Sequence, residues 1–139
     1  MSIKTYLVLA LFGALYFTVV NCQGDMDIRT AQYYTHGHKL YQVHCANCLG
    51  LNGEGLGKLY PPLTDTNSIS AHRNQLPQFI RYGIKEPMNI AGEIYDVEMP
   101  PNAQLSKVDI AYILTYITNS FGNQQGIYTE DEVEKHLAQ

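Results

Sequence analysis

Residues 45–63 read CANCLGLNGEGLGKLYPPL, and this stretch carries the strongest structural signal in the chain. It begins with Cys45 and Cys48 in a C-x-x-C spacing. The residues that follow are rich in glycine and end on the pair Pro61-Pro62, a composition that suits neither a helix nor a strand. We therefore expect a long loop that starts directly after the two cysteines.

Upstream of this stretch, residues 1–22 have the layout of a signal peptide. Lys4 supplies a positive charge, and residues 6–20 then run without any charge, a basic start before an apolar middle. These fifteen residues fall short of the ~20 that cross a bilayer easily, so we expect cleavage and an exported, periplasmic protein. Cys22 directly follows the apolar run, as the lipidated cysteine does in bacterial lipoproteins. Lipidation of Cys22 would anchor the protein to the membrane facing the periplasm, whereas a cut near Gln23 would release it.

The remaining chain has the size and composition of one small domain. We expect a domain over residues 23–124 and a helical extension over residues 125–139. The chain has 9 basic and 13 acidic residues, a formal charge of −4, and removal of Lys4 with the leader makes it −5. An acidic surface of this kind argues against nucleic acid as a partner.

The C-x-x-C pair has three common uses in an exported protein: a disulfide, half of a zinc site, or thioether attachment of haem. A zinc site needs more ligands, and the sequence holds no second C-x-x-C. A thioredoxin-like redox motif belongs to a βαβ context, and we find no strand pattern around Cys45 and Cys48.

Apolar periodicity predicts helices on both sides of the loop. The first runs from about Ile28 into Cys45, where residues three and four apart share one face: Ala31, Tyr34, His38, Tyr41 and Cys45. Gly37 lies in its middle, where a glycine costs ~1 kcal/mol relative to alanine. This position indicates that another helix passes close by.

Three further helices are expected towards the C-terminus. A short one starts near Asn74, with Pro77 in its first turn, and ends at Gly83. The clearest one begins at a capping box of Ser106 and Asp109 and carries one apolar stripe: Ile110, Ile113, Leu114, Ile117 and Phe121. A last one begins at Thr129, with Glu132 closing a second capping box. No run alternates with period two, so we predict an all-α protein without substantial strands.

In this order, the motifs resemble class I cytochrome c over nearly all of the mature chain. The resemblance implies a cytochrome c-like fold in which the N- and C-terminal helices cross and loops surround a haem pocket. It is carried by the following residues: Gly37, Tyr41 and Cys45 in the first helix, Asn52-Gly53-Glu54-Gly55 and Pro61-Pro62-Leu63 in the loop, Met99-Pro100-Pro101 and Leu105-Ser106 before the last helix, and Ile113 and Tyr116 within it.

The resemblance also implies a cofactor and its contacts. Cys45 and Cys48 would attach haem c covalently, and Met99 would bind the iron from one side. Pro62 falls where a proline carbonyl orients the ring of the second axial ligand, a histidine. Met88 is expected to be a packing residue.

The motif departs from the family at one position, since Leu49 stands where the histidine ligand follows the second cysteine. Leucine has no lone pair to donate to iron. His44 lies five residues earlier, about 140° round a helix, and is expected to point away. His72 is expected in a loop, where nothing in the sequence holds its side chain in place. The other histidines are expected on the surface or in packing roles: His36, His38 and His136.

Three functions follow from these observations. The first is a haem-binding electron-transfer protein with atypical iron coordination, which exchanges electrons with redox partner proteins. The second is a haem-free relative that keeps the scaffold for binding, motivated by Leu49. The third is a thiol–disulfide oxidoreductase using Cys45 and Cys48, which lack a flanking basic residue other than His44. No catalytic acid, base or substrate pocket is evident, so the chain is not expected to be an enzyme.

Overall fold

The computed structural model describes residues 27–139. The expected leader, with Cys22, lies outside the described residues. The elements are, in chain order, α2 (Ile28–His44), α3 (Ala46–Leu49), α4 (Thr66–Ala71), the 3-10 turn η1 (Arg73–Gln75), α5 (Leu76–Tyr82), β1 (Met88–Ile90), β2 (Glu93–Tyr95), α6 (Lys107–Ile117) and α7 (Glu130–Leu137). The all-α prediction is confirmed. Within this part of the chain, no helix has the length and apolar character needed to cross a membrane.

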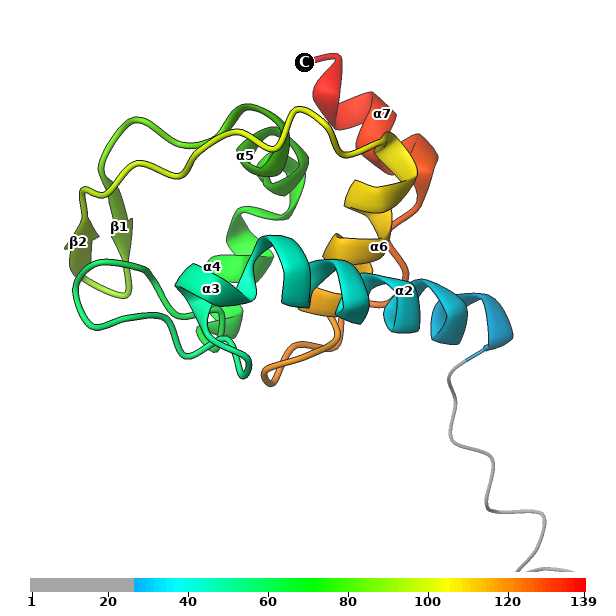
Figure 1. The fold of residues 1–139 in the computed structure, drawn as a ribbon, viewed down its shortest axis with the longest axis horizontal. Coiled ribbons are helices and arrows are strands. Elements are labelled where there is room, and N and C mark those ends of the chain that lie inside the picture. The colour runs from blue at the N-terminus through cyan, green and yellow to red at the C-terminus, as the bar shows by residue number, and fades with distance from the viewer. Residues whose placement is uncertain (1–26) are drawn as a thin grey trace, which may run out of the picture.

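Helices α2 and α6 cross against each other, as the sequence predicts (Figure 1). The side chain of Asp27 caps α2 by accepting hydrogen bonds from the backbone of Arg29 and Thr30, which satisfies free N–H groups at the helix start. Gly37 is buried at the crossing, against the backbone carbonyl of Tyr112 on α6. The predicted close approach of a second helix to Gly37 is therefore confirmed.

Helix α6 forms the centre of the core. Its capping box is complete, because Ser106 Oγ accepts from the Asp109 backbone and the Asp109 carboxylate accepts from the Ser106 backbone. Its predicted apolar stripe is buried at Ile110, Ile113, Leu114 and Ile117. The placement of Phe121 on this stripe is wrong, because the helix ends at Ile117 and Phe121 follows with φ 56°, although it still packs partly buried against the same core. Burial of this stripe contributes most of what holds the helix in place, since an isolated helix of 11 residues is marginal in water.

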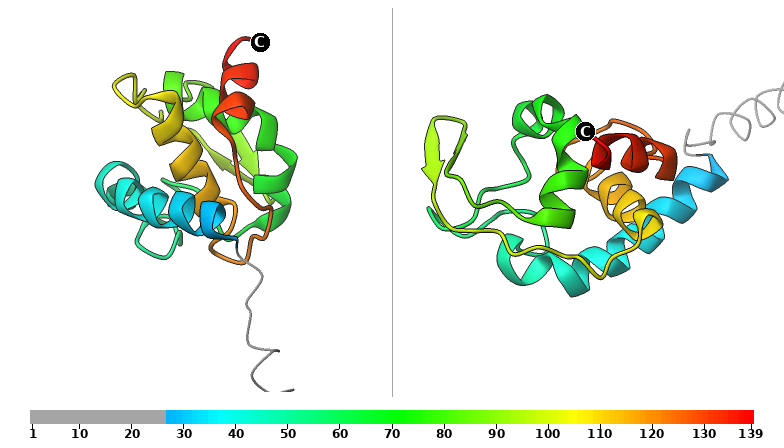
Figure 2. Two further views of the ribbon diagram at one scale, coloured as in Figure 1. Left: turned by 90° about the vertical axis from the view of Figure 1, so that its right-hand side faces the viewer. Right: turned by 90° about the horizontal axis from the view of Figure 1, so that it is seen from above.

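Residues 124–139 pack back onto this core beside α5 and α6 (Figure 2). Tyr128 and Val133 are fully buried in the cluster that contains α6. Thr129 caps α7 by accepting from the Glu132 backbone. The second capping box was also predicted to have the Glu132 carboxylate accept from the backbone N–H of Thr129. This part of the prediction is wrong, because the Glu132 side chain pairs with Arg73 instead. A bidentate guanidinium partner outcompetes a local backbone N–H for this carboxylate.

The other end of the molecule consists of loops and a short hairpin. Strands β1 and β2 pair antiparallel with Met88 opposite Tyr95, and their three residues each agree with the prediction that no substantial strand exists. Helix α4 was not predicted from the sequence, because its six residues are too few for apolar periodicity to show. In Figure 1 the hairpin lies at the end of the molecule away from α7.

Candidate functional site

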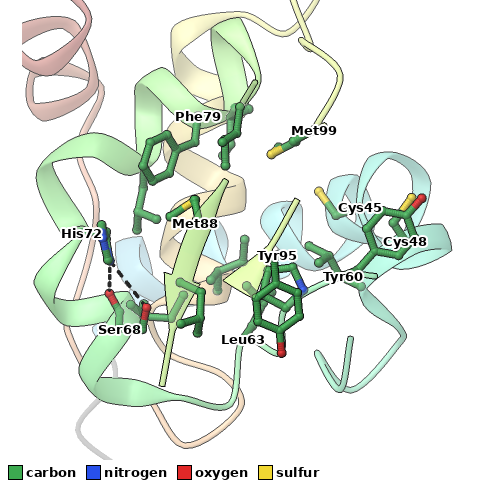
Figure 3. Close-up of a pocket in the computed structure, with 18 of the residues that line it drawn as sticks. Cys45, Cys48, Tyr60, Leu63, Ser68, His72, Phe79, Met88, Tyr95 and Met99 are labelled. Atoms are coloured by element: carbon green, nitrogen blue, oxygen red, sulfur yellow. Dashed lines mark hydrogen bonds between the residues drawn. The ribbon is translucent and has the colours of Figure 1, made fainter. Parts of the chain in front are cut away.

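A large apolar pocket lies between α3, the α4–α5 region and the segment that carries Met99 (Figure 3). Its empty volume is about 1280 Å³, a figure that includes the open mouth. Most of its wall consists of aliphatic and aromatic side chains from α5, the hairpin region and α6, among them Phe79, Ile80, Ile84, Ile90, Leu114 and Ile117. Such a lining favours a large, mostly apolar ligand.

Cys45 and Cys48 lie together on the wall formed by the end of α2 and α3 (Figure 3). Both are partly buried and both are free thiols. Burial, followed by the nearby Cys48, raises the pKa of the Cys45 thiol to about 12. Cys45 is therefore protonated at neutral pH, and a protonated thiol is a poor nucleophile for disulfide exchange. This finding weighs against the thiol–disulfide oxidoreductase hypothesis.

Tyr41 fixes the backbone next to the cysteine pair. Its ring is fully buried, and its hydroxyl donates a 2.7 Å hydrogen bond to the carbonyl of Gly50, directly after Leu49. Burial raises the pKa of the Tyr41 hydroxyl well above its usual range. The hydroxyl therefore stays protonated as a donor, and the turn that presents Cys45 and Cys48 to the pocket is held in one conformation.

Met99 faces the same pocket from the segment before α6 (Figure 3). Its backbone is anchored on both sides, because its N–H donates to the Ile84 carbonyl at 2.9 Å and its carbonyl accepts from the Ile84 N–H at 3.0 Å. Met88 also lines the pocket, from β1. The pocket thus contains two thioether sulfurs, and both are carried by paired backbone segments.

Leu49 and Pro62 complete the part of the site that the sequence predicted. Both line the pocket and both are partly buried. Leu49 belongs to the same packed cluster as Cys45 and Met99. The loop after it folds back through hydrogen bonds from Gly55 N–H to the Leu49 carbonyl, 2.9 Å, and from Leu63 N–H to the Gly53 carbonyl, 2.8 Å. All five predicted site residues therefore meet at one cavity.

Two predictions about histidines are wrong. His44 was expected to point away, but it lines the pocket, because α2 ends at His44 and the backbone of Cys45 leaves helical geometry with φ −124° and ψ −38°. His72 was expected in a loop without support, but it caps α4, and its ring Nδ1 lies 2.8 Å from the Ser68 carbonyl. His72 also lines the pocket. The sequence carries no signal for this contact, because its acceptor is a backbone carbonyl, which any residue at position 68 would supply.

The remaining histidines lie away from the pocket wall. His36 and His38 are exposed on α2 and lie against the rings of Tyr112 and Tyr116. His136 is buried in α7. Within residues 27–139, no group of three His, Cys, Asp or Glu side chains is placed to hold a metal ion directly.

Comparison with known proteins agrees with this geometry. The family model for cytochrome c matches residues 34–121. A cytochrome c-552 of Thermus thermophilus is 29% identical over 108 residues, which cover 71% of this chain and 82% of the relative. The fructose dehydrogenase cytochrome subunit of Gluconobacter japonicus is 27% identical over 127 residues, which cover 86% of this chain but only 25% of that longer protein.

Proposed function

Because this chain belongs to the cytochrome c family, whose members bind haem c covalently, we propose that it is an exported electron carrier in which Cys45 and Cys48 form the two thioether links and Met99 binds the iron. The observation that carries the proposal is that these three side chains line one apolar pocket. Family membership supports a role in electron transfer, and on this proposal the chain is a carrier and not an enzyme.

The residues present fit a covalently held macrocycle. Two thiols lie on one wall, a thioether lies on an anchored segment facing the same space, and the lining between them is largely apolar. Large rings would pack against Phe79 and the aliphatic side chains of α5 and α6. The donor set fits less well at Leu49, which offers no lone pair where the family has its histidine.

The bound haem would supply an iron that takes up and releases one electron at a time. The chain's own residues set the conditions for that exchange. The apolar wall excludes water, which disfavours the more highly charged oxidised form of the iron. Met99 favours the reduced form further, since a thioether ligand raises the reduction potential. Tyr41 fixes the turn beside the cysteine pair, and the Ile84–Met99 backbone pair fixes the segment that carries Met99.

Leu49 makes the iron site of this protein atypical. With leucine at this position, the end of α3 would offer no donor atom to the iron of a bound haem. Any donor besides Met99 would then have to come from another part of the chain or from outside it. The acidic surface and the relative that is a dehydrogenase subunit support a protein as redox partner rather than a nucleic acid.

The haem-free alternative is favoured by Leu49 alone. An empty pocket is costly, because its largely apolar lining is left in contact with water and without packing partners. The largest side chains at the pocket, Phe79, Tyr60 and Tyr95, line it without closing it. The size of the pocket therefore supports a bound cofactor.

Mass spectrometry tests the proposal directly. The full chain is produced in a bacterial host that carries the machinery for c-type haem attachment, and the purified protein is denatured and extracted with acidic organic solvent. We expect one haem to stay bound to the polypeptide, and we expect Soret absorbance in the native protein. A polypeptide mass without haem would contradict the proposed function.

Four cysteine variants serve as controls in the same measurement. Cys45→Ser and Cys48→Ser should each leave at most one thioether link, and the double variant should lose haem entirely on extraction. Cys22→Ser should retain as much covalent haem as the unchanged protein. If haem survives extraction from the double variant, the two residues are not the attachment points. Lipidation of Cys22 and membrane attachment are read out by whether Cys22→Ser moves the protein from the membrane to the soluble fraction.

A further inference from the structure

The ring of His72 is held in an orientation and a tautomer that suit metal binding. Its Nδ1 lies 2.8 Å from the backbone carbonyl of Ser68, and the Ser68 hydroxyl lies 3.5 Å from the same nitrogen. A backbone carbonyl accepts but never donates, so Nδ1 carries the hydrogen in the neutral ring. The other ring nitrogen, Nε2, then keeps its lone pair. A ring N–H bonded to a backbone carbonyl is the support that histidine ligands of metals generally have.

The backbone that carries His72 is fixed from both sides. Its N–H donates to the Ser68 carbonyl at 3.0 Å, and its own carbonyl accepts from Gln75 and Leu76 at 2.8 and 3.1 Å. The next residue, Arg73, pairs with Glu132 on α7 at 3.0 Å, and the Tyr128 hydroxyl donates to the Arg73 carbonyl at 3.0 Å. The C-terminal segment therefore holds in place the turn on which His72 stands.

His72 lines the pocket from the wall across from Cys45 and Cys48 (Figure 3). Its ring lies beside Phe79, with centroids 6.2 Å apart. His72 is partly exposed, and among residues 27–139 its ring forms hydrogen bonds through Nδ1 alone.

The other histidine at the pocket, His44, lacks comparable support. It ends α2 beside the cysteine pair, and among residues 27–139 no hydrogen bond to its ring is found. His72 is therefore the imidazole at this pocket whose free nitrogen is positioned in advance, and an imidazole positioned in advance loses less side-chain entropy when it binds.

On the basis of the proposed function, we propose that His72 supplies the nitrogen ligand of the haem iron in place of the histidine that is absent at position 49. The ligand is then donated from the turn after α4 rather than from the attachment motif. Leu49 serves as an apolar contact on the side of the pocket where the family's ligand would stand.

The test uses the haem-loaded full chain with ¹⁵N-labelled histidine and pulsed electron paramagnetic resonance of the ferric state. We expect a histidine nitrogen coupled to the iron in the unchanged protein, lost in His72→Gln and retained in the matched control His44→Gln. Glutamine at 72 still donates an N–H to the Ser68 carbonyl, so the turn is preserved. Loss of the coupling in His44→Gln, or its persistence in His72→Gln, would overturn the proposal.

Imidazole titration provides a second readout. If His72 occupies the iron about nine-tenths of the time, His72→Gln should bind added imidazole about ten-fold more tightly than the unchanged protein. Equal affinities would contradict ligation by His72. The haem content measured by mass spectrometry separates failure of the proposed function from failure of the His72 assignment. Absence of covalent haem contradicts the proposed function and not the choice of ligand.

The variant Leu49→His distinguishes ligation from a contact with the haem carboxylates. Once a histidine at 49 binds the iron, adding His72→Gln should leave the spectrum unchanged. If His72 instead binds a carboxylate of the haem, its substitution should shift the spectrum equally in the unchanged protein and in Leu49→His. This result would contradict the assignment of His72 as the iron ligand.

Discussion

Gly37 of α2 lies directly against the backbone carbonyl of Tyr112 on α6, so that a Cβ atom at position 37 would overlap that carbonyl and would also lie 2.8 Å from Tyr116 Cβ. The neighbouring rings close the contact around this point: Tyr33 packs edge-on against Tyr112, and Tyr34 packs against Tyr116. The crossing of α2 and α6 is thus set by the absence of one side chain, and it determines where α2 delivers the cysteine pair.

Gly37→Ala should destabilise the protein. Overpacking a close contact costs ~1–3 kcal/mol, which exceeds the ~1 kcal/mol that alanine gains over glycine inside a helix. The obstacle is backbone, so no side chain can move aside. Denaturant unfolding should show the loss, and Gln32→Ala on the exposed face of α2 serves as a control that should change stability by less than ~0.5 kcal/mol. Stability equal to that of the unchanged protein would contradict the packing described here.

Cys45 should react slowly in the folded, haem-free chain. Its pKa is raised to about 12 by burial, whereas the unfolded thiol has a pKa of ~8.5. The stabilising contribution of this group is thus complete below pH ~8.5 and is lost as the pH rises towards 12, because the unfolded chain deprotonates first. Alkylation at pH 9 in the variant Cys22→Ser, Cys48→Ser, where burial remains the main cause of the raised pKa, should be at least ~100-fold slower than in the same chain unfolded in urea. Comparable rates would show that the thiol is not buried.

Arg73→Ala should weaken the attachment of the C-terminal segment. The guanidinium pairs with Glu132, hydrogen-bonds Gln125 and lies 4.4 Å from the centre of the Tyr128 ring. The side chains of the pair are 23% and 27% exposed, so we expect a loss of ~1–3 kcal/mol, between exposed and fully buried pairs.

The matched control is Lys107→Ala, which removes a second ion pair to α7, with Glu134. The side chains of that pair are 41% and 61% exposed, and its loss should cost less than ~1 kcal/mol. Thermal unfolding of both variants compares the losses of stability caused by Arg73→Ala and Lys107→Ala. If Lys107→Ala is the more damaging change, the role assigned to Arg73 is wrong.

In the His72→Gln background, Leu49→His should restore a six-coordinate, low-spin haem centre. The new imidazole would stand directly after the attachment motif, beside Pro62, whose carbonyl is expected to accept its ring N–H. We also expect more covalent haem per chain. Absorption and magnetic circular dichroism spectra of the ferric protein give the spin state. A spectrum unchanged from that of His72→Gln alone would mean that residue 49 does not face the iron.

Met99→Leu should lower the reduction potential and leave the fold intact, because leucine conserves volume and the thioether ligand that raises the potential is gone. Met88→Leu is the control, since Met88 lines the same pocket and was predicted to be a packing residue. Redox titration of both variants measures the effect. If the reduction potential falls further in Met88→Leu than in Met99→Leu, then Met88 rather than Met99 is the iron ligand.

Much of the fold could be predicted from local sequence alone. The N-terminal helix, the capping box at Ser106 and the stop at Gly83 depend on residues within one or two turns of each other, where backbone hydrogen bonding and side-chain sterics act directly. Gly37 indicated the crossing because a mid-helix glycine is unfavourable unless something approaches closely. The residues of the site could be predicted as a set, because their order matched a family pattern.

The tertiary structure decided which side chains reach the pocket from a distance. Glu132 pairs with Arg73, 59 positions away, a choice that no local rule of helix capping contains. His44 faces the pocket because the backbone turns at Cys45, and His72 faces it because the α4–η1 turn is fixed by Ser68 and by the C-terminal segment. The orientation of a side chain at a helix end depends on the dihedral angles of the turn and on long-range partners. These are set by packing of the whole chain, and for that reason they could not be predicted from the spacing of residues.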